Sequence, residues 1–164
     1  MDNEKILTFN MIWQSVPLGR DYSRFEQDLK NRWKPGECMN ALYAFEGRHD
    51  AHPFDTTLYI GMTEMQGVHR ALQSAQQRFF TIDSPSKMYG SYRDVILRWA
   101  IIDSSDSGIT KALESLFIIA MKPPLNSKEV DVWLPESAWN LIVSNREDKG
   151  VLLPMLHGDY FTHL

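Results

Sequence analysis

Two short apolar runs that each contain a tyrosine limit most strongly how this chain can fold. ALYAF (41–45) and TLYIG (57–61) are separated by the polar segment EGRHDAHPFDT. Aromatic and β-branched residues favour strands, and Pro53 in the polar segment marks a loop. The pattern predicts a hairpin that brings Tyr43 and Tyr59 close together. Two neighbouring phenols can serve packing alone, or they can share a proton-transfer task.

The segments around this hairpin predict a small α/β arrangement. Apolar residues recur at helical spacing before it, between Tyr22 and Trp33. After it we predict a helix from about Thr63 to Phe79, a strand at VILRWAII (95–102), and a helix over 104–122 that Pro123-Pro124 ends. Hairpin, helix, strand and helix predict a central antiparallel or mixed sheet of about three strands, flanked by helices.

The two ends of the chain carry weaker signals. KILTF (5–9) and VDVWL (130–134) are typical of short strands, and PESAWNLIVSN (135–145) reads as a helix that begins at a proline. We expect residues 1–164 to form a single domain with a core at about 40–127. The flanking segments 1–39 and 128–164 have no assigned role.

Composition restricts the class of protein. The single cysteine, Cys38, excludes an internal disulfide and fits a reducing compartment. The polar, acidic start lacks the apolar stretch of a signal peptide, and no window approaches the ~20 apolar residues of a membrane span. We therefore expect a soluble cytoplasmic protein that has no membrane partner.

Charge is distributed unevenly along the chain. The net charge of −4 argues against a broad, sequence-blind grip on nucleic acid. The segment from Arg70 to Lys128 nevertheless carries eight Lys/Arg against five Asp/Glu, whereas the remainder carries nine against sixteen. A basic middle within an acidic frame could attract a polyanion, and Arg78, Lys87 and Arg93 are the candidate nucleic-acid contacts.

Five polar residues on separate predicted elements form a candidate site: Tyr43, Tyr59, Arg70, Glu114 and Asn126. Arginine matches phosphate oxygens, a carboxylate is a preferred ligand of Mg²⁺, and a deprotonable group can activate water. Together these groups could handle a phosphodiester. Each also has an ordinary interpretation, as a core aromatic, a solvated helix residue or a turn former.

The order and wording of these residues resemble a known family. Across roughly residues 40–127, ALYAF…TLYIGMT…HR…ALESLFIIAMKPPLN resembles the GIY-YIG nuclease superfamily. That pattern has two tyrosine strands, an arginine on the next helix, a glutamate on a later helix, and an asparagine after a proline-bearing turn. The resemblance implies that both tyrosines face one catalytic groove.

The resemblance also implies a role for each residue. Tyr43 is the general base, directly or through the attacking water, and Tyr59 positions water or phosphate. Arg70 steadies the scissile phosphate, Glu114 holds one Mg²⁺ or Mn²⁺, and Asn126 orients the site. A phenol has an ordinary pKa near 10, so it acts as a base at neutral pH only where nearby cations favour the phenolate.

The expected function is that of a metal-dependent DNA endonuclease. One such site cuts one strand, so double-strand cleavage would need a homodimer or two sequential events. Three positions depart from the family pattern: Ala41 replaces a glycine, Met62 replaces a common lysine, and Ser74 stands where many members carry His or Tyr. The sequence leaves open DNA or RNA as the substrate.

Other functions stay open. The departures and the net acidity fit a nucleic-acid-binding module of the same fold with weak or lost catalysis. A metal-binding or protein-interaction domain could use the apolar, tryptophan-containing C-terminal third. His49, Asp50, His52 and Asp55 could also bind a metal, although a polar hairpin loop is the better interpretation of that segment.

Overall fold

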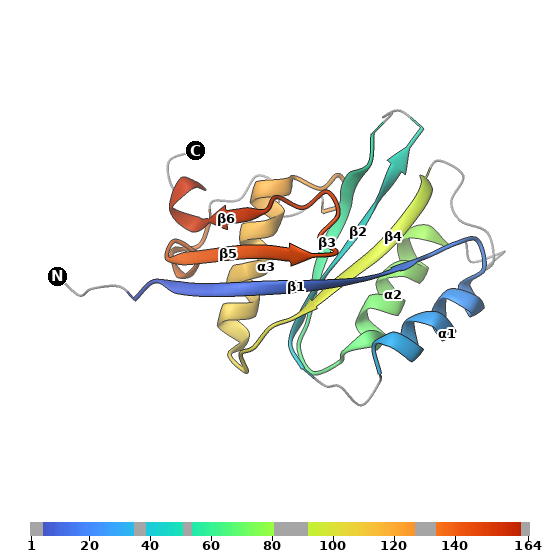
Figure 1. The fold of residues 1–164 in the computed structure, drawn as a ribbon, viewed down its shortest axis with the longest axis horizontal. Helices are drawn as coiled ribbons and strands as arrows, with labels where there is room; N and C mark the ends of the chain where they lie inside the picture. Colours follow the sequence, from blue (N-terminus) through green and yellow to red (C-terminus); the bar gives the residue numbers. More distant parts are fainter. Residues whose placement is uncertain (1–4, 35–38, 51–53, 81–91, 127–133, 162–164) are drawn as a thin grey trace.

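The computed structural model describes residues 5–34, 39–50, 54–80, 92–126 and 134–161. Within these ranges the chain forms three α-helices and one six-stranded mixed sheet (Figure 1). The strands are β1 (Leu7–Pro17), β2 (Ala41–His49), β3 (Thr56–Thr63), β4 (Tyr92–Ile101), β5 (Leu141–Glu147) and β6 (Met155–His157). The helices are α1 (Tyr22–Arg32), α2 (Val68–Phe79) and α3 (Ser107–Met121), with short 3₁₀ turns η1 (Glu136–Ala138) and η2 (Gly158–Phe161). No helix among the described residues is long and apolar enough to cross a membrane.

The predicted α/β class and the central order of elements are confirmed. β2 and β3 form the expected antiparallel hairpin, in which Tyr43 lies opposite Gly61, and β4 pairs with the other edge of β2. α2 follows β3 and α3 follows β4, as hairpin, helix, strand and helix predicted. α2 begins at Val68 rather than near Thr63 because β3 extends to Thr63 and a short loop follows it.

The prediction of about three strands is wrong, because the flanking segments extend the sheet. Its order is β3-β2-β4-β1-β5-β6, so β1, β5 and β6 add to the predicted core. β1 pairs antiparallel with β4 and parallel with β5. The helix predicted over 135–145 is limited to η1, because its β-branched residues Ile142 and Val143 pair with Thr8 and Phe9 of β1.

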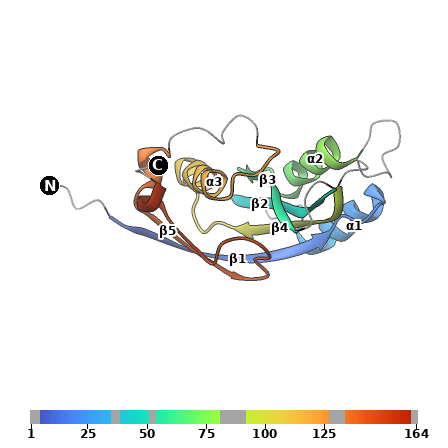
Figure 2. The same cartoon turned by 90° about the horizontal axis from the view of Figure 1, so that it is seen from above.

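The helices cover opposite faces of the central strands. In β2, Leu42 and Ala44 belong to the core cluster that contains residues of α3, whereas Tyr43 and Phe45 belong to the cluster that contains residues of α1 and α2. This division follows from the alternation of side chains along a strand. Figure 2 shows β3 between α3 and α2. The edge strand of the sheet is therefore flanked by both of these helices.

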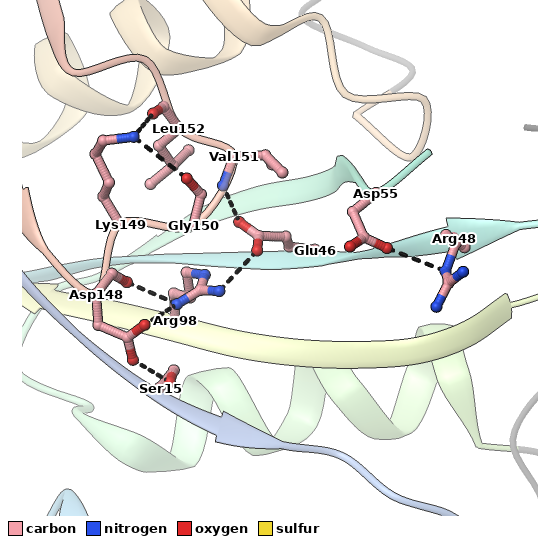
Figure 3. A network of polar contacts seen from close by, with 10 residues as sticks. All are labelled: Ser15, Glu46, Arg48, Asp55, Arg98, Asp148, Lys149, Gly150, Val151 and Leu152. Atoms are coloured by element: carbon pink, nitrogen blue, oxygen red, sulfur yellow. Dashed lines mark hydrogen bonds and ion pairs between the residues drawn. The ribbon is translucent and has the colours of Figure 1, made fainter. Parts of the chain in front are cut away.

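A buried ion pair fastens the loop after β5 to the central strands (Figure 3). Arg98 is 7 % exposed and Glu46 is 4 % exposed, and Arg98 Nη2 donates to Glu46 Oε1 at 2.8 Å. Arg98 Nη1 donates to Oδ1 of Asp148 at 2.6 Å, and the backbone N–H of Val151 donates to Glu46 Oε2 at 3.0 Å. Gly150 has a φ of +58°, and a Cβ there would collide with both buried side chains. The loop is thus fitted to the ion pair.

Candidate active site

A cleft of about 700 Å³ lies at edge strand β3 and is lined by residues of α2 and α3 as well. All five residues of the sequence-predicted site line it: Tyr43, Tyr59, Arg70, Glu114 and Asn126. They come from β2, β3, α2, α3 and the turn that follows α3. The fold therefore gathers into one cavity side chains that span more than eighty residues of sequence.

Tyr43 is held rigidly at this cleft. Its ring packs over Gly61, the residue that faces it across the hairpin, and a Cβ on Gly61 would lie 2.5 Å from Cζ and the hydroxyl of Tyr43. The Tyr43 hydroxyl shares a hydrogen bond of 2.7 Å with Oγ of Ser74 on α2. The glycine of TLYIG is thus required for close approach, and Ser74 takes part in the site by holding the phenol.

Burial sets the protonation of Tyr43. The side chain is 1 % exposed, and this desolvation, followed by the nearby phenol of Tyr59, raises the pKa of Tyr43 above its usual value of 10. The hydrogen bond to Ser74 and the charges of Arg70 and Arg78 lower this pKa, but by less than burial raises it. Tyr43 is therefore a neutral phenol at pH 7 when neither substrate nor metal is bound.

Tyr59 and two arginines of α2 form the wall beside Tyr43. The rings of Tyr43 and Tyr59 are 6.2 Å apart between centroids. The guanidinium carbon of Arg78 lies 3.7 Å from the centroid of the Tyr59 ring, which is the geometry of a cation–π contact. Arg70 is exposed, and its Nη1 donates to Oε1 of Gln73 at 3.1 Å. Arg78, proposed from sequence as a nucleic-acid contact, thus lies in the cleft with Arg70.

Asn126 clamps the outer edge of β3. Its Oδ1 accepts a hydrogen bond from Ile60 N at 2.8 Å, and its Nδ2 donates to Ile60 O at 2.7 Å. Leu125 N donates to Leu58 O at 3.0 Å. The turn after α3 therefore satisfies backbone groups that an edge strand otherwise leaves unpaired. Asn126 fixes the strand that carries Tyr59 and Gly61, so it orders the site through the backbone.

The donor groups of the cleft fit a hard divalent cation. Mg²⁺ commonly accepts only one or two protein carboxylates and completes its shell with water and phosphate oxygens. Glu114 and Glu64 both line the cleft and are partly buried. Oε1 of Glu64 is buried and has no hydrogen-bond partner among the described residues, as expected of an acceptor beside an ion or water site. Among the described residues, no three or more His, Cys, Asp or Glu side chains lie close enough together to hold a metal ion by themselves.

Sequence reasoning missed two charged residues of the cleft, Lys111 and Glu64. Lys111 lies three residues before Glu114, and this spacing puts both on one face of α3. That spacing could have identified it. Glu64 directly follows β3, so only the path of the loop places it in the cleft. Lys111 adds a cation to the cleft, which Met62 also lines.

Of the two other predicted nucleic-acid contacts, Arg93 and Lys87, only Arg93 lies within the described residues. Arg93 Nε pairs with Oδ1 of Asp50 at 2.9 Å, and Arg93 is not among the residues that line the cleft. Lys87 lies outside the described residues. In the hairpin segment weighed as a metal site, Asp55 pairs with Arg48 at 3.2 Å, so the described carboxylates of that loop have arginine partners.

Comparison with family models, with curated proteins and with solved structures gives no match. Function is therefore inferred from the side chains that line the cleft and from their order along the sequence. Two phenols, three cationic side chains and two carboxylates meet there, with an amide that fixes the edge strand. This set can bind a phosphodiester, hold a divalent cation and exchange a proton with water.

Proposed function

We propose that this protein is a Mg²⁺- or Mn²⁺-dependent endonuclease that hydrolyses phosphodiester bonds of DNA. The convergence of Tyr43, Tyr59, Arg70, Glu114 and Asn126 in one cleft supports the proposal most strongly. Their order along the chain resembles the GIY-YIG pattern, and the gathering of these side chains is what such chemistry requires. The sequence alone did not require that they meet.

In this proposal, cationic side chains on α2 and α3 bind the phosphate. Arg70 and Arg78 come from α2 and Lys111 comes from α3, so cations stand on both sides of edge strand β3. Guanidinium groups pair with phosphate oxygens, and an ammonium group adds a compact positive charge. A phosphodiester in the cleft would thus be held from both walls, with its scissile phosphorus near the tyrosines.

Glu114 is the proposed metal ligand, and Glu64 lies in the same cleft. A bound Mg²⁺ or Mn²⁺ would stabilise the charge that develops on the phosphate oxygens. In the proposed reaction, the phenolate form of Tyr43 accepts a proton from water, directly or through a second water, as the water oxygen bonds to phosphorus. The bond to the leaving sugar oxygen breaks, and that oxygen takes up a proton from solvent. Ser74 and Gly61 keep the Tyr43 hydroxyl in place for that transfer.

A plasmid-nicking assay with and without Mg²⁺ tests the proposal. We expect supercoiled plasmid to become nicked in Mg²⁺ or Mn²⁺ and to stay intact in EDTA. Absence of cleavage in both metals, over a range of pH and salt, would contradict endonuclease activity on DNA. The same assay on RNA tests the preference for DNA.

The raised pKa of Tyr43 predicts an alkaline pH dependence. A group whose pKa lies above the working pH is mostly protonated. As long as the pH stays below that pKa, each increase of one pH unit raises the deprotonated fraction of the group about tenfold. We expect the initial nicking rate at saturating Mg²⁺ to rise by up to about tenfold per unit between pH 7 and 9. Tyr43→Phe should lose activity at every pH. A flat profile, with an inactive Tyr43→Phe, would leave Tyr43 a positioning role only.

Lys111 should contribute one phosphate contact. For duplex DNA each neutralised phosphate contributes a slope of about 0.9 to the fall of log K with log salt. We therefore expect Lys111→Gln to weaken DNA binding in EDTA and to reduce that slope by about one, as measured by fluorescence anisotropy. Lys30→Gln on α1, which does not line the cleft, is the matched control. An unchanged slope in Lys111→Gln would place the DNA elsewhere.

A second function is favoured by one observation. The neutral Tyr43, with Met62 in place of a lysine, fits a nucleic-acid-binding module of weak catalytic power. Salt-dependent binding in EDTA without cleavage in any metal would identify that module.

A further inference from the structure

The loop between β3 and α2 (residues 64–67) holds a methionine in a strained conformation at the rim of the cleft. Met65 has a φ of +64°, and across it the backbone N–H of Gln66 donates to Glu64 O at 2.8 Å. A hydrogen bond from residue i to residue i+2 around a positive φ is the rare, strained form of the γ-turn. Residues with a Cβ seldom adopt this conformation, and strain of this kind concentrates at functional sites.

The strained residue is also an exposed apolar one. The Met65 side chain is 67 % exposed, so packing within the chain does not repay the strain. Its neighbours Glu64 and Gln66 both line the cleft, so Met65 stands beside the groups proposed to act on phosphate. Gly67 in the same loop has a φ of +52°, which glycine adopts without steric cost. The conformation of the loop alone therefore does not explain why residue 65 is a methionine rather than a glycine.

We infer that Met65 is a base-contacting residue, which packs on or between nucleobases next to the bound phosphate. The inference rests on the proposed function. Arg70, Arg78 and Lys111 can bind the charged backbone of a nucleic acid, whereas its bases need apolar contacts that these cations do not provide. Methionine is flexible and polarisable and packs well on aromatic faces, and apolar side chains of this kind wedge between base steps.

Methionine oxidation measures the contact in the unmodified protein. The full chain in EDTA and low salt is treated with dilute peroxide, with and without saturating mixed-sequence 30-nucleotide DNA, single-stranded or duplex. Oxidation is followed by mass spectrometry at Met65 and at Met155 on β6, which is 61 % exposed and does not line the cleft. We expect DNA to slow oxidation of Met65 at least about fivefold and to leave Met155 unchanged. Equal protection of both methionines, or of neither, overturns the inference.

Two substitutions of Met65 distinguish the effect of losing its side chain from the effect of relieving the strained backbone. Met65→Gly adopts a positive φ freely, so its fold should be kept, and Met65→Ala removes the side chain but keeps the Cβ. We expect both to weaken DNA binding by about fivefold, the lower end of what stacking of a base on an aromatic side chain contributes, because the apolar contact with the bases is lost. Met155→Ala should bind as the unmodified protein does. Wild-type affinity in Met65→Gly would overturn the inference.

The outcomes distinguish this inference from the proposed function. If the unmodified protein binds and cuts DNA while Met65 is neither protected nor required, the inference fails and the endonuclease stands. If no DNA or RNA binds at low salt, both fail. Protection of Met65 without any cleavage would support the base contact and the binding module.

Discussion

Glu114→Gln is expected to slow metal-dependent DNA cleavage by at least ~100-fold, about 2.7 kcal/mol of transition-state stabilisation. Glutamine keeps the shape of the side chain and removes its charge, so the ligand proposed to hold the cation is lost. Glu114 is partly buried on α3 and lines the cleft with Tyr43 and Arg70. The measurement is the initial nicking rate at saturating Mg²⁺, repeated in Mn²⁺.

The controls for Glu114→Gln distinguish the loss of a carboxylate in the cleft from the loss of a carboxylate elsewhere on the protein. Glu136 in η1 is exposed and does not line the cleft, so Glu136→Gln should cut at the unmodified rate. DNA binding of Glu114→Gln in EDTA should hold or improve, because a negative charge near phosphate has been removed. An unfolding midpoint close to that of the unmodified protein shows that the fold is kept. Cleavage at the unmodified rate in Glu114→Gln would rule out the single-carboxylate metal role.

Arg98→Ala is expected to reduce the free energy of unfolding by about 3–5 kcal/mol. Removal of one partner leaves Glu46 charged, buried and facing an empty space where the guanidinium had been. The same change removes both hydrogen bonds that Arg98 donates to Asp148, so the loop after β5 loses its attachment to β4. Chemical denaturation followed by tryptophan fluorescence measures the change, since Trp99 lies next to Arg98 in the core.

The matched control for Arg98→Ala is Arg48→Ala. Arg48 lies on the same strand as Glu46 and pairs with Asp55 and Asp94, but the exposed fractions of these three side chains are 48 %, 55 % and 69 % (Figure 3 draws the pair with Asp55). Exposed pairs of this kind contribute about 0–1 kcal/mol, so Arg48→Ala should change stability by no more than that. The double change Glu46→Gln with Arg98→Met should recover part of the lost stability, because no unpaired charge remains buried. Equal effects of Arg48→Ala and Arg98→Ala would contradict the importance of the buried pair.

Local patterns in the sequence determined the central elements. Apolar residues at helical spacing predicted α1, and its buried side chains Phe25 and Leu29 lie on the predicted face. The two tyrosine runs predicted the hairpin, and Pro123 after α3 predicted its end. Such signals are readable because they depend on residues that are close in the chain, through periodicity, capping and the fixed φ of proline.

Long-range pairing decided what those patterns could not. PESAWNLIVSN has a plausible helical start, yet Ile142 and Val143 form β5 because β1 offers a parallel partner more than a hundred residues earlier in the chain. The same pairing turned a sheet of about three strands into one of six. Strand propensity depends on which neighbours a segment finds, and a single sequence does not state those neighbours.

For the candidate site too, the sequence determined some properties and the tertiary structure determined others. The sequence by itself determined which chemical groups are present and the order in which Tyr43, Tyr59, Arg70, Glu114 and Asn126 occur. Only the tertiary structure decided that they line one cleft, and that Lys111 and Glu64 join them. It also decided that Tyr43 is a buried phenol with a raised pKa, because desolvation arises from atoms that β2, β3 and α2 bring together. A residue type fixes what a side chain can do, and its packed surroundings fix its charge, its direction and its partners.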